Sequence, residues 1–260
     1  MTALTPSTNF ITDLHKIVGT DHARPAVAAD SIDGLPAKWI VEPATVHELS
    51  EVLKVANAHK LAVIARGNGT KLNWGNPPRN VDIVLSTNRM NRILEHAAGD
   101  MTATVETGCA IADLNKMLAL RGQRLALDPL WPDRATIGGI IATNDSGPLR
   151  ATYGTLRDHL IGITAVLPDG TIAKSGGKVV KNVAGYDLPR LFLGSFGTLA
   201  IIAQATLRLY PIAHQTQTLC FTGSAPLDTI ITAMRNRSAA ITAVQFQITS
   251  QSQLSLLVLV

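Results

Sequence analysis

The chain has 260 residues, of which 46% are apolar, 16% are charged and only 4% are aromatic. This length and composition suffice for one or two buried cores and exclude an intrinsically disordered chain. The formal net charge is +4 and the charged residues are scattered, so we expect no nucleic-acid partner.

The cysteines and the N-terminus bear on compartment and metal content. Cys109 and Cys220 lie far apart and form no Cys-x-x-Cys motif, so the sequence predicts neither a zinc nor an iron–sulfur site. The start of the chain lacks the apolar core of a signal peptide, and no apolar run approaches the roughly 18 residues of a membrane-spanning helix. We expect a cytoplasmic protein without a transmembrane segment, and membrane association through partner subunits stays open.

Regular elements follow one another from residue 10 onward. Residues 10–18 predict a short helix and 39–41 a strand. Thr45 and Glu48 have capping-box spacing at the start of the next helix. Further strands are expected at 61–65, 81–85, 102–106, 161–167, 171–174 and 199–209, and a further helix is expected to bury Ile111, Leu114, Met117 and Leu118. The stretch 128–155, rich in glycine and proline, shows no long periodic segment and predicts an irregular functional region.

After Pro211 the pattern changes to a strand at 216–221, a helix at 226–237 and strands at 241–249 and 254–260. Such a unit needs further elements to cover its sheet, so we expect a partial α+β cap domain that is truncated. The expected divisions are an N-terminal helix and linker (1–37), a central domain (38–213) and this partial cap (214–260).

Three glycine-containing segments carry the candidate chemistry. In the first, an apolar strand runs into Arg66-Gly-Asn-Gly-Thr70, where glycines can present backbone N–H groups to an anion, and Arg66, Thr70 and Lys71 add donors. The spacing matches neither a Walker A nor a Rossmann motif. The second segment, 132–150, combines small residues with hydroxyl and amide groups that suit a flat ligand. The third, 178–202, contributes Lys178 and Lys181.

Together these segments resemble the FAD-binding domain of the vanillyl-alcohol oxidase/p-cresol methylhydroxylase (PCMH-type) flavoprotein family. The resemblance covers residues 38–213. It rests on Ala-Arg-Gly-Asn-Gly-Thr-Lys-Leu-Asn-Trp-Gly (65–75), Thr-Ile-Gly-Gly (136–139), Lys-Asn-Val-Ala-Gly-Tyr-Asp-Leu (181–188) and Gly-Ser-Phe-Gly-Thr-Leu-Ala-Ile-Ile (194–202). Residues 70–75 and 181–188 favour the glycolate oxidase FAD-binding subunits over the D-lactate dehydrogenases. The implied fold is α+β: a two-subdomain PCMH-type FAD-binding fold followed by the start of a ferredoxin-like cap.

The resemblance also implies binding roles. Residues 66–70 would bind the FAD pyrophosphate, 136–147 would line the pyrophosphate and the isoalloxazine, and Ile201 and Ile202 would hold the adenine end. Lys181 is the candidate cation near the pyrimidine edge of the flavin. The expected cofactor-binding residues are Arg66, Gly67, Asn68, Gly69, Thr70, Pro132, Thr136, Ile137, Gly138, Gly139, Ala142, Thr143, Asn144, Ser146, Gly147, Arg150, Tyr153, Gly154, Lys181, Ile201 and Ile202. Several relatives link FAD covalently through a histidine in the first loop; this loop has none, which implies non-covalent FAD.

The implied function is that of the FAD-binding subunit of a complex of the glycolate oxidase or dehydrogenase type, which oxidises glycolate to glyoxylate. A second flavoprotein subunit and an iron–sulfur subunit are the implied partners. The seven histidines form no His-x-x-His motif, so we assign no metal ligand, and we assign no catalytic base. Two alternatives stay open: a non-catalytic FAD-binding scaffold, and a truncated stand-alone D-2-hydroxy-acid dehydrogenase.

Overall fold

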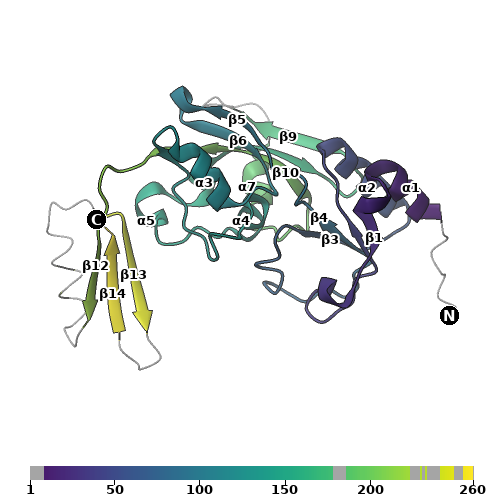
Figure 1. Cartoon of the computed structure of the whole chain (residues 1–260), viewed down its shortest axis with the longest axis horizontal. Coiled ribbons are helices and arrows are strands. Elements are labelled where there is room, and N and C mark those ends of the chain that lie inside the picture. Colours follow the sequence, from purple (N-terminus) through teal and green to yellow (C-terminus); the bar gives the residue numbers. More distant parts are fainter. Residues whose placement is uncertain are drawn as a thin grey trace.

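The computed structural model describes residues 9–177, 186–222, 229, 232, 241–248 and 254–259. Two sheets form the body of the molecule, and a three-stranded sheet extends from one end of it (Figure 1). Among the described residues, no helix is long and apolar enough to cross a membrane.

The first sheet is built around three parallel strands. Its order is β1-β2-β4-β3, with β1 antiparallel to β2 at one edge. The strands are β1 (Ala23–Pro25), β2 (Trp39–Val41), β4 (Ile83–Ser86) and β3 (Val63–Arg66). Helices α1 (Asn9–Val18) and α2 (Val46–Ala58) pack against each other and share a core with this sheet. At the start of α2, Thr45 Oγ1 accepts a hydrogen bond from the Glu48 amide at 3.0 Å, which confirms the predicted cap.

The second sheet is antiparallel throughout, in the order β5-β6-β10-β8-β9. Its strands are β5 (Ile93–Ala97), β6 (Thr102–Glu106), β10 (Ile201–Arg208), β8 (Leu160–Val166) and β9 (Ile172–Gly176). The predicted hairpin between 161 and 174 is confirmed by the β8–β9 pairing. The helices of this part are α3 (Ile111–Ala119), α4 (Ile137–Thr143), α5 (Arg150–Tyr153), α6 (Leu156–His159) and α7 (Leu188–Phe192).

The remaining elements are short or lie near the C-terminus. The short pair β7 (Gln123–Arg124) and β11 (Tyr210–Pro211) leads to a sheet of order β12-β14-β13. Its strands are β12 (Thr218–Thr222), β14 (Leu254–Leu259) and β13 (Ala243–Ile248), at the three predicted places. Three 3₁₀ turns are described: η1 (Thr20–His22), η2 (Ala28–Asp30) and η3 (Ala98–Asp100). The helix expected at 226–237 falls almost entirely outside the described residues.

Two expectations from the sequence are wrong. The stretch 128–155 is not irregular throughout, because it contains α4 and α5. Helix α4 buries Ile137, Ile140 and Ile141 on one face, and two glycines conceal this short pattern in the sequence. Met117 does not join the buried face of α3; it is 53% exposed.

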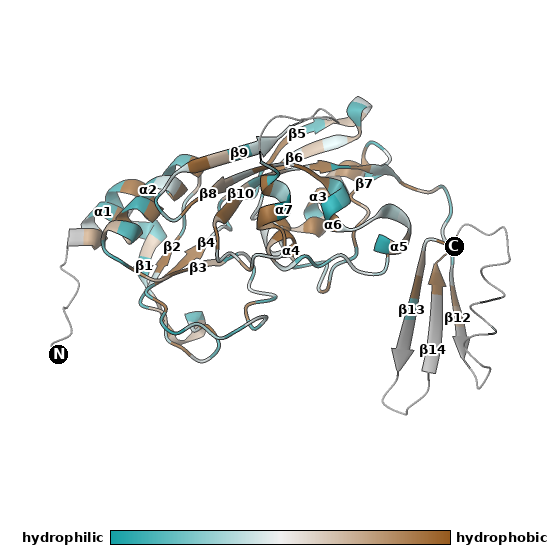
Figure 2. Cartoon of the chain, turned by 180° about the vertical axis from the view of Figure 1, so that it is seen from behind, coloured by the Kyte–Doolittle hydropathy of each residue, from teal (hydrophilic) through white to brown (hydrophobic). Residues whose placement is uncertain are grey.

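The two sheets share their cores. Val166 of β8 and Ile201 of β10 belong to the second sheet, yet they pack among the residues of α2 and the first sheet. Figure 2 shows hydrophobic residues concentrated in the strands of both sheets and hydrophilic residues on the outer turns of α3. This shared core holds the carboxyl end of β3 beside α4 and β10, and the candidate site lies there.

Candidate functional site

The first wall of the site is the loop that follows β3. Gly69 has φ +73°, a conformation that favours glycine. Gly67 has no positive φ, so its requirement for glycine has a different origin. It must be glycine because a Cβ would collide with the Thr136 side chain. The close approach of these backbones joins the first loop to the start of α4.

The Arg66 guanidinium in this loop is already paired. Its Nη2 donates to Asp30 Oδ1 at 3.1 Å, and Arg24 donates to the other oxygen of the same carboxylate at 2.9 Å. Burial favours a raised pKa for Asp30, but hydrogen bonds from Arg24, the Val27 amide and Arg66 outweigh it and lower the pKa to about 2. Arg66 therefore contributes an oriented, partly neutralised cation to the site, and backbone N–H groups remain the main anion donors of the loop.

The lowered pKa of Asp30 predicts a pH-dependent contribution to stability. Since the native pKa is below that of the unfolded chain, the contribution is present above pH 4 and is lost as the pH falls toward 2. We expect D30N to lower the free energy of unfolding at pH 7 by about 2 kcal/mol. Urea denaturation should show this difference from wild type shrinking between pH 4 and 2, whereas a constant difference would contradict the assignment. D113N, at an exposed carboxylate, is the control.

The second wall is α4. Thr136 caps it by accepting a hydrogen bond from the Gly139 amide at 3.3 Å. A Cβ on Gly138 would lie 2.9 Å from Thr107 Cβ, so glycine is required for α4 to approach the end of β6. Thr143 Oγ1 donates to the Gly139 carbonyl at 2.8 Å, and Asn144 ends the helix with φ +53°.

The third wall is the loop 194–198 that leads into β10. The Gly194 amide donates to the Ile141 carbonyl at 3.0 Å and the Phe196 amide donates to the Ala142 carbonyl at 2.8 Å. These bonds lay the loop along the carboxyl end of α4. The Phe196 ring is 49% exposed and stands at the rim of the site.

Together the three walls enclose a cleft of about 730 Å³, which extends toward Thr107 and Ile202 as a narrower pocket of about 80 Å³. A volume of this size is typical of small-molecule sites. The structure brings twelve sequence-predicted residues to this cleft and its extension: Arg66, Gly67, Asn68, Gly69, Thr70, Thr136, Gly138, Gly139, Ala142, Thr143, Ile201 and Ile202.

Eight other predicted residues do not line the cleft, and Lys181 lies outside the described residues. The eight are Pro132, Ile137, Asn144, Ser146, Gly147, Arg150, Tyr153 and Gly154. Ile137 faces the core, and Ser146 Oγ accepts a hydrogen bond from the Leu156 amide at 3.2 Å. Gly147 has φ +63°, and a Cβ there would collide with Asp128. Ile137, Ser146 and Gly147 therefore pack against the residues behind the cleft and do not form its surface.

Arg150 and Tyr153 belong to α5, and Gly154 caps its carboxyl end. The Tyr210 ring lies 4.9 Å from the Tyr153 ring and 5.4 Å from the His159 ring, measured between ring centroids. Burial lowers the pKa of His159 to about 4, so the ring is neutral at pH 7. Burial also raises the pKa of nearby Asp128 to about 6. In the part of the chain that the structure describes, no three His, Cys, Asp or Glu side chains form a candidate metal site.

A clasp joins the first loop to the segment before and after α4. We define it as the Lys71–Asp145 ion pair, the Trp74–Trp131 ring contact and the hydrogen bond from Asn68 Nδ2 to the Arg134 carbonyl. Lys71 Nζ lies 3.2 Å from Asp145 Oδ2, and both side chains are less than 10% exposed. Lys71 was expected to supply charge to an anion; it does line the cleft, and its ammonium is paired with Asp145. The sequence of residues 70–75 does not indicate whether Lys71 binds an anion or forms an ion pair within the protein.

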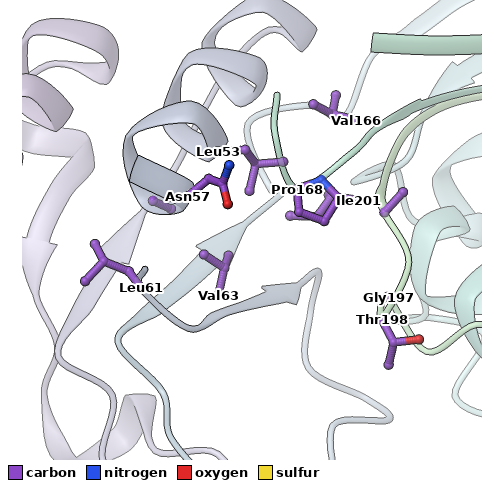
Figure 3. A pocket seen from close by; sticks show the side chains of 11 residues that line it. Leu53, Asn57, Leu61, Val63, Val166, Pro168, Gly197, Thr198 and Ile201 are labelled. Carbon is purple, nitrogen blue, oxygen red and sulfur yellow. The ribbon is translucent and has the colours of Figure 1, made fainter. Parts of the chain in front are cut away.

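A side cavity of about 220 Å³ adjoins the cleft (Figure 3). It lies between α2, the start of β3 and the turn after β8, and shares Val63, Gly197 and Thr198 with the cleft. Apolar side chains such as Leu53, Val166 and Pro168 line it together with the polar side chains of Asn57 and Thr198.

Comparison with protein families and known proteins gives concordant results. The family model described as "FAD binding domain" matches residues 37–176. The glycolate oxidase subunit GlcD of Bacillus subtilis is 38% identical over 180 residues, which are 69% of this chain and 38% of that protein. A D-lactate dehydrogenase of Archaeoglobus fulgidus is 37% identical over 212 residues, 78% of this chain and 47% of that protein. The chain thus spans less than half the length of these relatives.

Solved structures show the same fold at low sequence identity. An alkyldihydroxyacetonephosphate synthase superposes with a TM-score of 0.80 at 18% identity, covering 100% of this chain and 57% of the other. Berberine bridge enzyme gives a TM-score of 0.75 at 16% identity, covering 98% and 55%. The predicted α+β, PCMH-type fold is confirmed.

Proposed function

The chain belongs to the FAD-binding domain family, and from that premise we propose that it is the FAD-binding subunit of a 2-hydroxy-acid-oxidising complex. Its cofactor is FAD. The substrate proposed is glycolate, which is oxidised to glyoxylate, with a second flavoprotein subunit and an iron–sulfur subunit as partners. The support for the substrate is the name of the Bacillus subtilis relative.

The observation that supports FAD binding most strongly is the cleft of about 730 Å³ that the glycine-containing first loop lines beside α4. Gly67 and Gly69 lie in its wall, Gly69 has φ +73°, and a Cβ at Gly67 would meet the Thr136 side chain, so the first loop lies close against the start of α4. A glycine-containing loop that can present successive backbone N–H groups fits a pyrophosphate. The residues that would hold FAD are 66–70 for the pyrophosphate, Thr136, Gly139 and Thr143 beside them, and Ile201 and Ile202 for the adenine end.

When bound, FAD supplies the acceptor for the two electrons that glycolate loses on oxidation. The chain itself binds and orients the cofactor and excludes water from it. We propose that binding is non-covalent, since no His, Cys or Tyr is found among the described residues that line the cleft. Lys181 remains our proposed cation near the pyrimidine edge of the flavin.

The proposal also includes the domain boundaries of the chain and its location in the cell. We propose a division into residues 1–37, a FAD-binding domain at 38–213 and a partial cap domain at 214–260, and a cytoplasmic location.

Anaerobic addition of substrate to the FAD-loaded protein tests the proposed reaction. We expect glycolate to bleach the visible flavin band when the chain is combined with its partner subunits, and D-lactate to bleach it less. A flavin that binds fully but stays oxidised with glycolate in the assembled complex would contradict the catalytic role and favour the scaffold alternative. Stronger bleaching by D-lactate in the chain alone would favour the stand-alone D-2-hydroxy-acid dehydrogenase.

A further inference from the structure

The antiparallel sheet has a second face, opposite the helices α3 and α4, which lie on one side of it (Figure 1). Val105, Ile163 and Ala205 pack in the core with those helices. Since side chains alternate along a strand, the residues next to them point to the opposite face. A cavity of about 110 Å³ lies on that face. We call it the sheet pocket; its lining includes Thr104, Gly162, Thr164, Lys174, Gly176, Gln204 and Thr206.

Two glycines on neighbouring strands create the sheet pocket. Gly162 of β8 pairs directly with Gly176 of β9, so this part of the face carries no side chains. Thr206 of β10 stands opposite Gly162 on the other side, and a Cβ on Gly162 would lie 3.1 Å from Thr206 Cβ. Gly176 has φ +77°, and a Cβ there would collide with the Ile161 carbonyl. The floor of the pocket is therefore backbone.

The adjacent row of the same face carries three polar side chains without protein partners. Lys174 stands opposite Thr164, and Thr164 stands opposite Gln204, so the three lie side by side. Within the part of the chain that the structure describes, none of the three makes a side-chain hydrogen bond or an ion pair. Thr164 is only 7% exposed. A nearly buried hydroxyl that lacks a protein partner and lines a cavity points to a ligand that forms a hydrogen bond with it.

Charge and volume restrict the class of ligand. Among the described residues that line the sheet pocket, Lys174 is the one charged side chain. Glu106, opposite Gln204 on β6, does not line it and is paired with Arg92 at 2.7 Å. One cation balances one negative charge, and the amide and hydroxyls suit a neutral polar group. At about 30 Å³ per water molecule, the volume corresponds to roughly four waters, or a ligand of about five non-hydrogen atoms.

We propose that the sheet pocket is a second binding site, which takes a small monocarboxylate that also carries a hydroxyl group. The Lys174 ammonium binds the carboxylate through a charge-assisted hydrogen bond. Thr164 and Gln204 bind the hydroxyl group and the second carboxylate oxygen. The sheet pocket shares no lining residue with the cleft or its extension. The proposal therefore does not depend on the proposed binding of FAD.

NMR titration of the ¹⁵N-labelled full chain with sodium glycolate tests the proposal. The amides of Gly162 and Gly176 report on the sheet pocket, and those of Gly67 and Gly69 report on the cleft. Ethylene glycol, the uncharged counterpart of glycolate, and inorganic phosphate are titrated in parallel. K174M removes the cation and K174R keeps it, while T164V removes the buried hydroxyl and retains a β-branched side chain suited to a strand. K116M, at an exposed lysine of α3, is the control.

We expect glycolate to shift the amides of Gly162 and Gly176, and ethylene glycol to bind at least about tenfold more weakly. K174M should weaken glycolate binding about tenfold and T164V about fivefold. K174R should retain most of the affinity, and K116M all of it. Titration with FAD should give wild-type affinity in every variant, which would show that the variants fold and that the two sites are separate.

Three results would overturn the proposal. The first is wild-type glycolate affinity in both K174M and T164V, and the second is a glycolate response confined to Gly67 and Gly69. The third is tighter binding of phosphate than of glycolate, because the pocket would then be a site for inorganic oxyanions. A wild-type chain that binds no FAD but shows the glycolate response at Gly162 would support the second site and contradict the proposed function.

Discussion

Substituting valine for Gly67 is expected to weaken FAD binding by about 2–3 kcal/mol, roughly 30- to 150-fold in Kd. The reason is steric, since any Cβ at this position meets the Thr136 side chain, which caps α4. Relief of the clash would push the first loop away from α4 and open the cleft between its two glycine-containing walls. Fluorescence titration of the apoprotein with FAD measures the effect.

Two further variants separate the clash from a general loss of stability. G99V introduces the same side chain at a glycine with no neighbour within 4 Å and no positive φ, and we expect it to bind FAD normally. T136G should partly restore binding to G67A, because it removes the atoms that a Cβ would meet. A G67V protein that purifies with full flavin occupancy would show that the first loop does not bind the pyrophosphate.

The largest effect on stability is expected from breaking the ion pair of the clasp. K71M leaves Asp145 buried without its cation, and D145N leaves the Lys71 ammonium buried without its carboxylate. Each should lower the free energy of unfolding by about 3–5 kcal/mol. The double variant K71M/D145N should be less damaging than the two losses added together, because no uncompensated charge then remains.

Urea denaturation of the two single variants and the double variant measures this coupling. The exposed pair Lys116–Asp113, with an Nζ–Oδ1 distance of 3.4 Å, is the control, and K116M should change stability by less than about 0.5 kcal/mol. If K71M and D145N were as mild as K116M, the clasp would not hold the first loop against α4. The FAD affinity of each variant, measured beside its stability, shows how strongly the width of the cleft depends on the clasp.

Much of the fold could be predicted because its signals are local. Thr45 and Glu48 mark the start of α2, and the Pro-Asp-Gly turn at 168–170 marks the β8–β9 hairpin. The glycines of the first loop indicate that its backbone approaches a ligand or a neighbouring segment closely. Because these signals are local, the sequence alone indicates three segments, 66–70, 132–150 and 178–202, that contribute residues to the cleft.

What could not be predicted depends on contacts between distant segments. Nothing local indicates that Asp30 pairs with Arg66, or that Thr136 makes Gly67 necessary. The buried ion pair of Lys71 and Asp145 joins residues 74 positions apart, so no local pattern in the sequence reveals it. Helix α4 was hidden because two of its seven residues are glycine, a poor helix former, and burial of its isoleucines outweighs that propensity.

The absorbance spectrum of the purified, FAD-reconstituted chain, recorded before and after acid precipitation, tests the central claim most directly. We predict one FAD per chain before precipitation, with all of the yellow colour in the supernatant afterwards, because we propose that the cleft binds the dinucleotide without a covalent bond. A chain that stays colourless after reconstitution would contradict the claim that these three walls bind FAD, and colour in the precipitate would contradict non-covalent binding.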